Sequence, residues 1–251
     1  MSVVADGPPV RHHLLPGVYN LRDTGGYRAG AGTSRWGRLF RSDALHRLDD
    51  AGRARLAQLR IAHVVDLRGA AERRASPSLL DGLNAQVHHL PVFAEADPAA
   101  QAAGEMALAP VYDHMVDERG PQLAAAVRVI ADAADDEAVL VHCTAGKDRT
   151  GLVVALALSA AGVERDEVVA DYATTADNLR GEWADGMLRS FAAQGLALTP
   201  QIVELVSASP APLMAALLER IDRDHGSAAD YLIAQGLDTA GIDRLTAALI
   251  G

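Results

Sequence analysis

One segment of this chain of 251 residues determines the structure of its candidate site, and it reads His142-Cys143-Thr144-Ala145-Gly146-Lys147-Asp148-Arg149-Thr150-Gly151. The apolar residues 138–141 before it are typical of a buried strand, and residues 150–161 are typical of a helix that ends at Gly162. Curled loop amides and the first turn of a helix both present N–H groups to anions. The sequence therefore predicts an anion-binding loop between a strand and a helix.

Cys143 and Arg149 are the two side chains of this loop with the clearest chemistry. Loop amides and a helix N-terminus favour the thiolate form of a cysteine, which is the nucleophilic form. A guanidinium six residues later can bind two phosphate oxygens and hold them during in-line attack. A lone cysteine on a buried strand is usually an inert core residue. Here the Gly, Lys, Asp and Arg that follow Cys143 favour the catalytic interpretation.

The other loop residues are expected to bind phosphate or to support the nucleophile. Gly146 lets the backbone curl around an anion without a Cβ in the way. We expect the Thr150 hydroxyl to donate to the thiolate. We expect His142 to support the loop by hydrogen bonding rather than to act as a base. The phosphate-binding set is Thr144, Ala145, Gly146, Lys147, Asp148 and Arg149.

Three upstream segments extend the pattern. The first segment is Asn20-Leu21-Arg22-Asp23 with Gly25-Gly26-Tyr27. The second is Gly37-Arg38-Leu39-Phe40-Arg41-Ser42, and the third is Val64-Val65-Asp66-Leu67-Arg68. The loop adds His-Cys, five residues, Arg, Thr and Gly. In this order the segments resemble the bacterial cysteine-dependent tyrosine and dual-specificity (triple-specificity) phosphatases related to mycobacterial PtpB and cyanobacterial IphP. The resemblance covers most of the chain.

This resemblance implies hydrolysis of phosphate monoesters through a phosphocysteine, by a protein-tyrosine or dual-specificity phosphatase. A phosphoinositide or inositol phosphate phosphatase is an alternative, because a lysine similar to Lys147 occurs in such enzymes. A non-catalytic phosphate-binding module and a rhodanese-like sulfurtransferase, whose loop is typically one residue shorter, are further alternatives. The expected partners are a phosphotyrosine protein or a phosphoinositide, with an oxyanion bound in the loop. No cofactor and no metal ion are expected.

The acid that protonates the leaving group has three candidates. The resemblance implicates Asp148 in catalysis, whereas a bond to Arg149 or to a neighbouring backbone group would make Asp148 structural. In the relatives of PtpB an Asp follows a His-Leu-Leu-Pro-like stretch. This chain has Ala94 at about that place, so Glu95 or Asp97 could substitute after a small shift of the loop.

Charged and aromatic residues elsewhere are expected to have supporting roles. Asp66 and Arg68 follow a strand at its carboxyl end, where the sites of α/β proteins collect, and they are expected to brace the loop. Arg22-Asp23 and Glu72-Arg73-Arg74 are interpreted as surface pairs in preference to groups at a pocket rim. Tyr112 lies in a segment expected to be mobile, where it would form an apolar wall for an aromatic ring.

Short apolar strands alternate with helices along the first two-thirds of the chain. Strands are predicted at 38–41, 61–67, 87–92 and 138–141, and helices at about 50–59, 121–134 and 150–161. From residue 164 onward only helices are predicted, near 168–179, 183–193 and 212–221 and from 238. This order predicts an α/β fold with a mainly parallel central sheet flanked by helices, like that of the tyrosine phosphatases.

Residues 1–251 are expected to form a single domain with a helical extension at about 164–225. Met187, Leu188 and Phe191 recur there at helical spacing, and core packing is the first explanation of such a stripe. By the resemblance, these helices would form a lid over the active site.

Composition excludes several other classes of protein. The 23 Lys and Arg against 33 Asp and Glu give a net charge of -10, which argues against a nucleic-acid-binding protein. One cysteine excludes an internal disulfide and a multi-thiolate metal site. The start carries no visible secretory signal, and no apolar run reaches the roughly 20 residues that cross a bilayer. A cytoplasmic protein is therefore expected, and export without a cleavable signal stays open.

Overall fold

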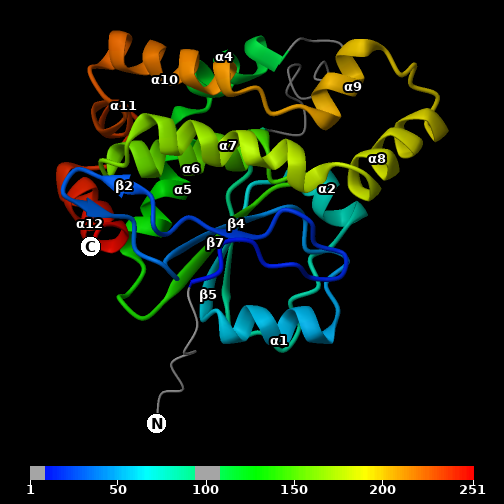
Figure 1. Ribbon diagram of the computed structural model, residues 1–251, viewed down its shortest axis with the longest axis horizontal. Helices are drawn as coiled ribbons and strands as arrows, with labels where there is room; N and C mark the ends of the chain where they lie inside the picture. Colours follow the sequence, from blue (N-terminus) through cyan, green and yellow to red (C-terminus); the bar gives the residue numbers. More distant parts are fainter. Residues whose placement is uncertain (1–8, 94–107) are drawn as a thin grey trace.

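The computed structural model describes residues 9–93 and 108–251 of the chain. Within them, five strands form a sheet in the order β1-β4-β7-β5-β6 (Figure 1). Neighbouring strands from β4 to β6 run parallel, and β1 alone pairs antiparallel, with β4. The strand bounds are β1 Arg22–Asp23, β4 Leu39–Ser42, β7 Ala138–His142, β5 Ile61–Asp66 and β6 Gln86–His89. The predicted mainly parallel α/β fold is confirmed.

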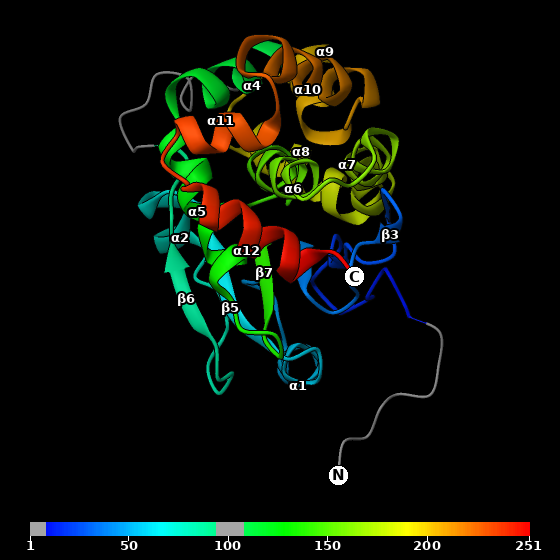
Figure 2. The same ribbon diagram turned by 90° about the vertical axis from the view of Figure 1, so that its left-hand side faces the viewer.

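Helices cover the sheet and make up the whole C-terminal part of the chain. Their bounds are α1 Asp50–Gln58, α2 Ala70–Ala75, α4 Leu108–Glu118, α5 Gly120–Asp132, α6 Asp148–Ala160, α7 Arg165–Leu179, α8 Glu182–Ala193, α9 Pro200–Ser207, α10 Ala211–His225, α11 Ala228–Ala234 and α12 Thr239–Leu249. A short pair, β2 (Arg28–Ala29) and β3 (Gly32–Thr33), lies outside the main sheet. Figure 2 shows α1 separated from α5, α6 and α12 by the strands.

The central strand β7 is buried on both faces. Successive residues of a strand point to opposite sides of the sheet. Val139 and Val141 belong to the core that α5 and α6 cover, whereas Ala138 and Leu140 belong to a second core, which includes Leu56 of α1. This double burial explains why the strand is a continuous apolar run instead of an alternating one.

Two helices differ from the sequence-based expectation in ways that matter for the site. Helix α6 begins at Asp148, two residues earlier than predicted, so Asp148 and Arg149 lie in its first turn. Helix α4 was not predicted, and its Tyr112 is fully buried in the core. The expected mobile apolar wall around Tyr112 is therefore wrong, because the hydrophobic stripe of this segment packs inward.

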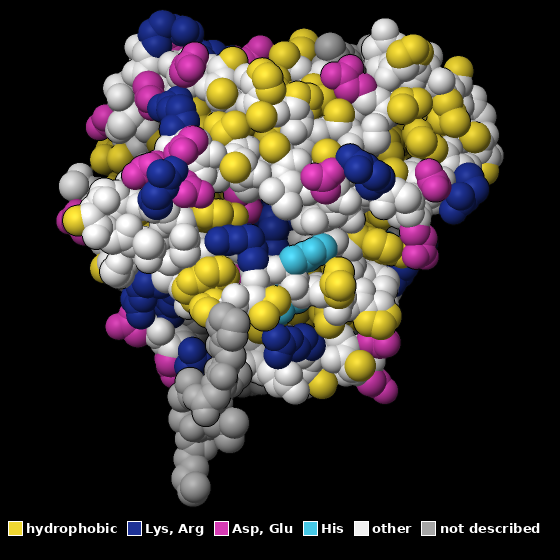
Figure 3. Space-filling view, in the orientation of Figure 1, with side chains coloured by type: hydrophobic (Ala, Val, Ile, Leu, Met, Phe, Trp, Pro, Cys, Tyr) yellow, Lys and Arg dark blue, Asp and Glu magenta, His cyan; other side chains and the backbone are white. Residues whose placement is uncertain are grey.

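The C-terminal helices do not all have the same relation to the core. Helices α7, α10, α11 and α12 contribute buried residues to the core that also holds α5 and α6. Helices α8 and α9 project from it at the right of Figure 1, and hydrophobic side chains gather over them in Figure 3. Leu196 and Leu198 between them are each 45% exposed, and Met187, Leu188 and Phe191 are only partly buried. Core packing therefore does not explain this apolar stripe.

Within the described part of the chain, no single helix has both the length and the apolar composition to cross a membrane. Helices α9 and α10 pass that test only when taken together, and they are bent by 76°.

Candidate active site

The loop from Cys143 to Lys147 links the end of β7 to the start of α6. Cys143 is 2% exposed, at the point where the buried strand ends. Gly146 has a φ of +66°, and a Cβ there would lie 2.2 Å from the Ser42 carbonyl oxygen. Only glycine combines this left-handed backbone with so close an approach. Gly146 is therefore required by the backbone path of the loop.

The carbonyl groups of the loop are held from one side by buried polar side chains. The Asn20 amide nitrogen donates to the Ala145 and Gly146 oxygens, at 3.1 Å each. Arg41 Nη2 donates to the Gly146 oxygen at 2.8 Å. Because these carbonyls point to that side, we expect the amides of the loop to line the other side, as in an anion-binding nest.

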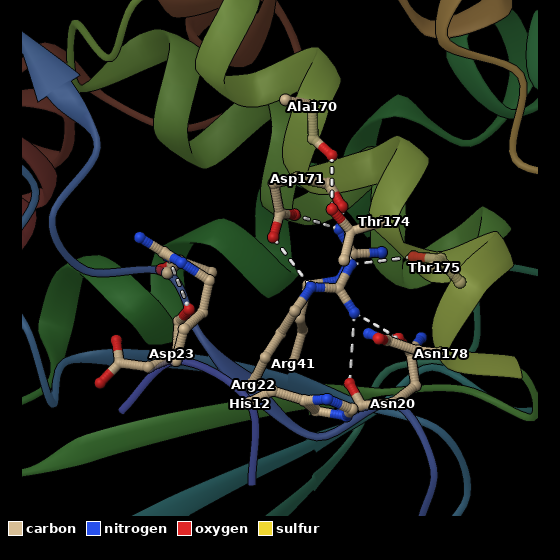
Figure 4. A network of polar contacts seen from close by, with 12 residues as sticks. His12, Asn20, Arg22, Asp23, Arg41, Ala170, Asp171, Thr174, Thr175 and Asn178 are labelled. Atoms are coloured by element: carbon tan, nitrogen blue, oxygen red, sulfur yellow. Dashed lines mark hydrogen bonds and ion pairs between the residues drawn. The ribbon is translucent and has the colours of Figure 1, made fainter. Parts of the chain in front are cut away.

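Asp171 of α7 fixes the two arginines that hold this side of the loop (Figure 4). Its carboxylate accepts from Arg22 Nε at 2.9 Å and from Arg41 Nη1 at 2.5 Å, and Tyr27 donates to it at 2.9 Å. Burial raises the pKa of Asp171, but the two guanidinium groups hold it well below its ordinary value. The interpretation of Arg22-Asp23 as a surface pair is wrong, since both residues are buried.

Arg149 is held by Glu72 of α2. Arg149 Nη1 lies 2.6 Å from Glu72 Oε2, and Arg149 Nη2 lies 2.8 Å from Glu72 Oε1. The Thr144 hydroxyl donates to the same carboxylate at 2.5 Å. Because the Glu72 carboxylate binds Nη1 and Nη2 at the end of the guanidinium, the edge formed by Nε and one Nη can still bind two oxygens of an anion. The surface-pair interpretation of Glu72 is therefore wrong.

Charges near this pair shift both pKa values. Burial by itself raises the pKa of Glu72. The hydrogen bonds and the charge of Arg149 outweigh this effect and lower the pKa to about 2. Burial lowers the pKa of Arg149, whereas the charges of Cys143 and Glu72 raise it above its ordinary value. The Arg149 guanidinium and the Glu72 carboxylate therefore hold each other in the charged form.

Asp148 lies in the first turn of α6 and is reached from α4. The Tyr112 hydroxyl donates to Asp148 Oδ1 at 3.0 Å, and Lys147 Nζ lies 3.6 Å from the same oxygen. The described ion pair of Asp148 is thus with Lys147, whereas Arg149 pairs with Glu72. This arrangement does not match the alternative in which Asp148 serves as the structural partner of Arg149.

Lys147 is 1% exposed and does not face open solvent. Its ammonium donates to the Leu205 carbonyl oxygen of α9. The side chain therefore connects the loop to the projecting helices α8 and α9.

The remaining predicted residues lie around the nucleophile. His142 Nδ1 is 3.2 Å from the Cys143 carbonyl oxygen, and burial lowers the pKa of His142 to about 4. Asp66 accepts from Arg68 Nε at 2.9 Å and lies 3.7 Å from His142 Nε2. The Thr150 hydroxyl is buried and has no hydrogen-bond partner among the described residues. The neutral histidine and the Asp66–Arg68 pair thus pack behind the loop.

Two predicted candidates and one unpredicted aromatic residue belong to the segment that follows β6. Glu95 and Asp97 lie outside the described residues. Phe93 is described, and its ring centroid is 5.9 Å from Arg149 Cζ. An aromatic surface is therefore present beside the guanidinium, at Phe93 instead of Tyr112.

Sequence reasoning gave Glu72 a surface role and missed Asp171 and also Tyr172, whose hydroxyl lies 2.8 Å from that of Tyr112. Glu72 had one available signal, its place in the first turn of a helix just after the strand that ends in Asp66. Asp171 and Tyr172 had none, because α7 reads as an ordinary amphipathic helix. No group of three or more His, Cys, Asp or Glu within residues 9–93 and 108–251 is arranged to hold a metal ion.

Known proteins resemble this chain over nearly its whole length. The pattern of the Tyrosine phosphatase family matches residues 13–251. The triple specificity protein phosphatase PtpB of Mycobacterium tuberculosis is 34% identical over 278 residues, which cover 94% of this chain and 98% of that protein. A tyrosine-protein phosphatase of Nostoc commune is 38% identical over 59% of this chain and 51% of its own length. The chain therefore belongs to the tyrosine phosphatase family.

Proposed function

We propose that this protein is a protein-tyrosine or dual-specificity phosphatase, which hydrolyses phosphate monoesters through a phosphocysteine on Cys143. The observation that carries the proposal is the end-on pairing of Arg149 with Glu72. It keeps one edge of a guanidinium ready for an anion, in a loop that starts at the only cysteine of the chain. A phosphate-binding module without catalysis would not require that cysteine.

In the first proposed step, the Cys143 thiolate attacks phosphorus in line with the leaving oxygen. Arg149 and the loop amides of residues 144–149 bind the equatorial oxygens, whose charge they stabilise in the transition state. The S–P bond forms as the P–O bond breaks. Asp148 gives its proton to the leaving oxygen, so a neutral phenol or alcohol departs. Glu95 or Asp97 would take this role if Asp148 does not.

In the second step, water attacks the phosphocysteine. The Asp148 carboxylate takes a proton from that water, the S–P bond breaks, and phosphate leaves. We propose that the buried Thr150 hydroxyl stabilises the departing thiolate, because it has no hydrogen-bond partner among the described residues. His142 and Asp66 support the loop and exchange no proton. The proposed steps use no metal ion and no organic cofactor.

The proposed substrate is phosphotyrosine in a protein. Phe93 supports this choice, because its ring lies 5.9 Å from Arg149 Cζ and can contact a phenyl ring. The two relatives are named as a tyrosine and a triple specificity phosphatase. The inositol phosphate alternative drew on Lys147 as a contact for additional phosphates. The burial of Lys147 against Leu205 gives that alternative less support.

We also propose that α8 and α9 act as a lid within a single domain of residues 1–251. The contact of Lys147 with Leu205 joins the lid to the phosphate-binding loop. A lid would shelter the thiolate from oxidation and limit which substrates enter.

The proposed nucleophile is tested with Cys143→Ser. We expect no detectable release of p-nitrophenol from p-nitrophenyl phosphate, with binding of inorganic phosphate retained in calorimetry. Activity within about tenfold of the unchanged protein would reject the phosphocysteine mechanism. A urea unfolding curve of the variant controls for loss of the fold.

A substrate panel tests the acid and the substrate class together. The kcat for phosphotyrosine, phosphoserine and phosphoinositide substrates is measured with the unchanged protein and with the variants Asp148→Asn and Glu95→Gln. We expect phosphotyrosine peptides to be preferred, and kcat to fall about a hundredfold or more in Asp148→Asn alone. A fall confined to Glu95→Gln would move the acid to the segment after β6.

A further inference from the structure

Two buried tyrosines extend the hydrogen bonding of Asp148 into the core. Tyr112 of α4 and Tyr172 of α7 are both fully buried, and their rings meet edge to face with centroids 6.1 Å apart. Their hydroxyl oxygens lie 2.8 Å apart, and the Tyr112 oxygen lies 3.0 Å from Asp148 Oδ1. Helix α4 therefore brings one hydroxyl to Asp148 Oδ1, and α7 brings a second hydroxyl to the first.

The direction of these hydrogen bonds follows from the charges. Burial, and then the charge of Asp148, raise the pKa of both Tyr112 and Tyr172 above its ordinary value, so both hydroxyls keep their protons. Each hydroxyl has one proton to donate. When Tyr112 donates to Asp148, its oxygen is left to accept the proton of Tyr172.

Lys147 reinforces the arrangement on the same oxygen. Its ammonium lies 3.6 Å from Asp148 Oδ1, and an ammonium group has donors but no acceptor. Both described contacts of the Asp148 carboxyl group thus bring hydrogen toward Oδ1. A proton on Oδ1 would face the lysine charge, whereas a proton on Oδ2 leaves both contacts intact.

We propose that Tyr112, supported by Tyr172, is a positioning residue that confines the transferable proton of Asp148 to Oδ2. This inference rests on the role of Asp148 proposed above. As the P–O bond of the substrate breaks, the Oδ2 proton passes to the leaving oxygen. As water attacks the phosphocysteine, Oδ2 takes one proton back from that water. The two tyrosines keep their protons through the cycle.

The test is the dependence of kcat/KM on the leaving group. Phenyl phosphate releases a poor leaving group that needs a proton, whereas p-nitrophenyl phosphate releases a good one. We expect Tyr112→Phe to lower kcat/KM about tenfold for phenyl phosphate and less than about twofold for p-nitrophenyl phosphate, because only proton transfer is impaired. Tyr172→Phe should produce the same pattern at about threefold.

Tyr231→Phe is the matched control. The Tyr231 hydroxyl is also buried and donates at 2.8 Å to the Val116 carbonyl oxygen of α4, but it does not contact Asp148. Its removal should change neither substrate's kcat/KM. Equal losses on both substrates in Tyr112→Phe, or no loss on either, would overturn the inference.

Asp148→Asn, measured on the same two substrates, separates this inference from the proposed acid. If Asp148→Asn lowers kcat/KM much more for phenyl phosphate than for p-nitrophenyl phosphate, Asp148 is the acid. If Tyr112→Phe then shows no such difference, the positioning role of Tyr112 is overturned while the role of Asp148 stands. If Asp148→Asn lowers kcat/KM equally for the two substrates, or for neither, both the acid role of Asp148 and the positioning role of Tyr112 are overturned. Turnover that still requires Cys143 would then keep the phosphocysteine mechanism.

Discussion

The two sides of the phosphate-binding loop are built differently. On the side of its carbonyl groups lies the anchor cluster, which we define as Asn20, Arg22, Arg41 and Asp171. The rim pair is Arg149 with Glu72 of α2, which follows β5, the strand next to β7 on the side away from β4. The side chains of Arg22, Arg41 and Asp171 are each 1% exposed, against 14% for Arg149 and 38% for Glu72. Ion pairing therefore serves two purposes in one site.

The difference follows from the cost of desolvation. Charges taken fully out of water are tolerated when they are paired, and the ion pairs of Arg22 and Arg41 with Asp171 hold the anchor cluster in one arrangement. The partly exposed rim pair keeps water at hand and one edge of Arg149 available. A substrate can use that edge without breaking the anchor. Rigidity and ligand binding are therefore assigned to different ion pairs of the same short loop.

The charge balance of the two sides also differs. In the anchor cluster two guanidinium groups share the Asp171 carboxylate, which leaves a net positive charge behind the loop. The rim pair is neutral before an anion binds. Asp43, whose carboxyl group accepts from the Asn20 backbone amide at 2.9 Å, adds an acidic residue next to this cluster, so the positive charge belongs to the two ion pairs and not to all the surroundings of the loop.

Arg149→Lys should have the largest effect on activity, and it should change the rim pair without changing the anchor cluster. A lysine lacks the planar fork that pairs with Glu72 and phosphate together. We expect kcat/KM for p-nitrophenyl phosphate to fall about a thousandfold, which is about 4 kcal/mol, with little change in unfolding free energy. The control is Arg165→Lys, which alters an exposed pair with Asp222. Loss of the fold in Arg149→Lys would remove the distinction between the two sides.

Asp171→Asn should affect the anchor through stability. The change leaves two buried guanidinium groups without their carboxylate, and we expect the free energy of unfolding to fall by about 3 kcal/mol. Asp222→Asn, at the exposed partner of Arg165, should cost less than about 0.5 kcal/mol. Urea unfolding measures both. Equal costs in the two variants would contradict the role of burial.

Mild acid should have a smaller effect, and it should act through His142, which contacts the Cys143 carbonyl oxygen and belongs to neither the anchor cluster nor the rim pair. The folded pKa of His142 is about 4, below its ordinary value of about 6.5, so the unfolded chain binds more protons between these values. Stability falls there as pH falls, and we expect about 2 kcal/mol to be lost through His142 between pH 7 and pH 5.

The rim pair should stay ionised over the same range. The folded pKa of Glu72 is about 2, so its stabilising charge is lost only as pH falls below its ordinary value. Urea unfolding of His142→Asn at several pH values measures the difference from the unchanged protein. A variant that loses as much stability as the unchanged protein between pH 7 and pH 5 would exclude His142 as the source.

Local patterns predicted the framework of the site well. The continuous apolar run at residues 138–141 indicated a buried strand, and β7 occupies 138–142. A helix was predicted at about 50–59, and α1 begins at Asp50, where the Asp49 carboxylate accepts from the Gly52 amide at 2.7 Å. These features depend on periodicity and on groups within a few residues of one another, so one stretch of sequence contains them completely.

The carboxylates that organise the site were not predictable in this way. Glu72 looked like one of many surface acids, and Asp171 lay in a helix with no distinguishing pattern. Tyr112 was assigned to a mobile wall because nothing local showed that α4 packs into the core. Each error concerned a residue whose function depends on a distant partner.

The sequence by itself determined the strand, the cysteine, the glycine that lets the loop curl and the arginine six residues later, because backbone propensity and spacing act locally. Only the tertiary structure decided the partner of each charge. Arg149 pairs with a residue 77 positions away, and Arg22 with one 149 positions away. Such pairs form because the fold brings α2 and α7 next to the loop, where Glu72 accepts from Thr144 and Asp171 accepts from Arg41, and a contact made by packing has no counterpart in the order of residues along the chain.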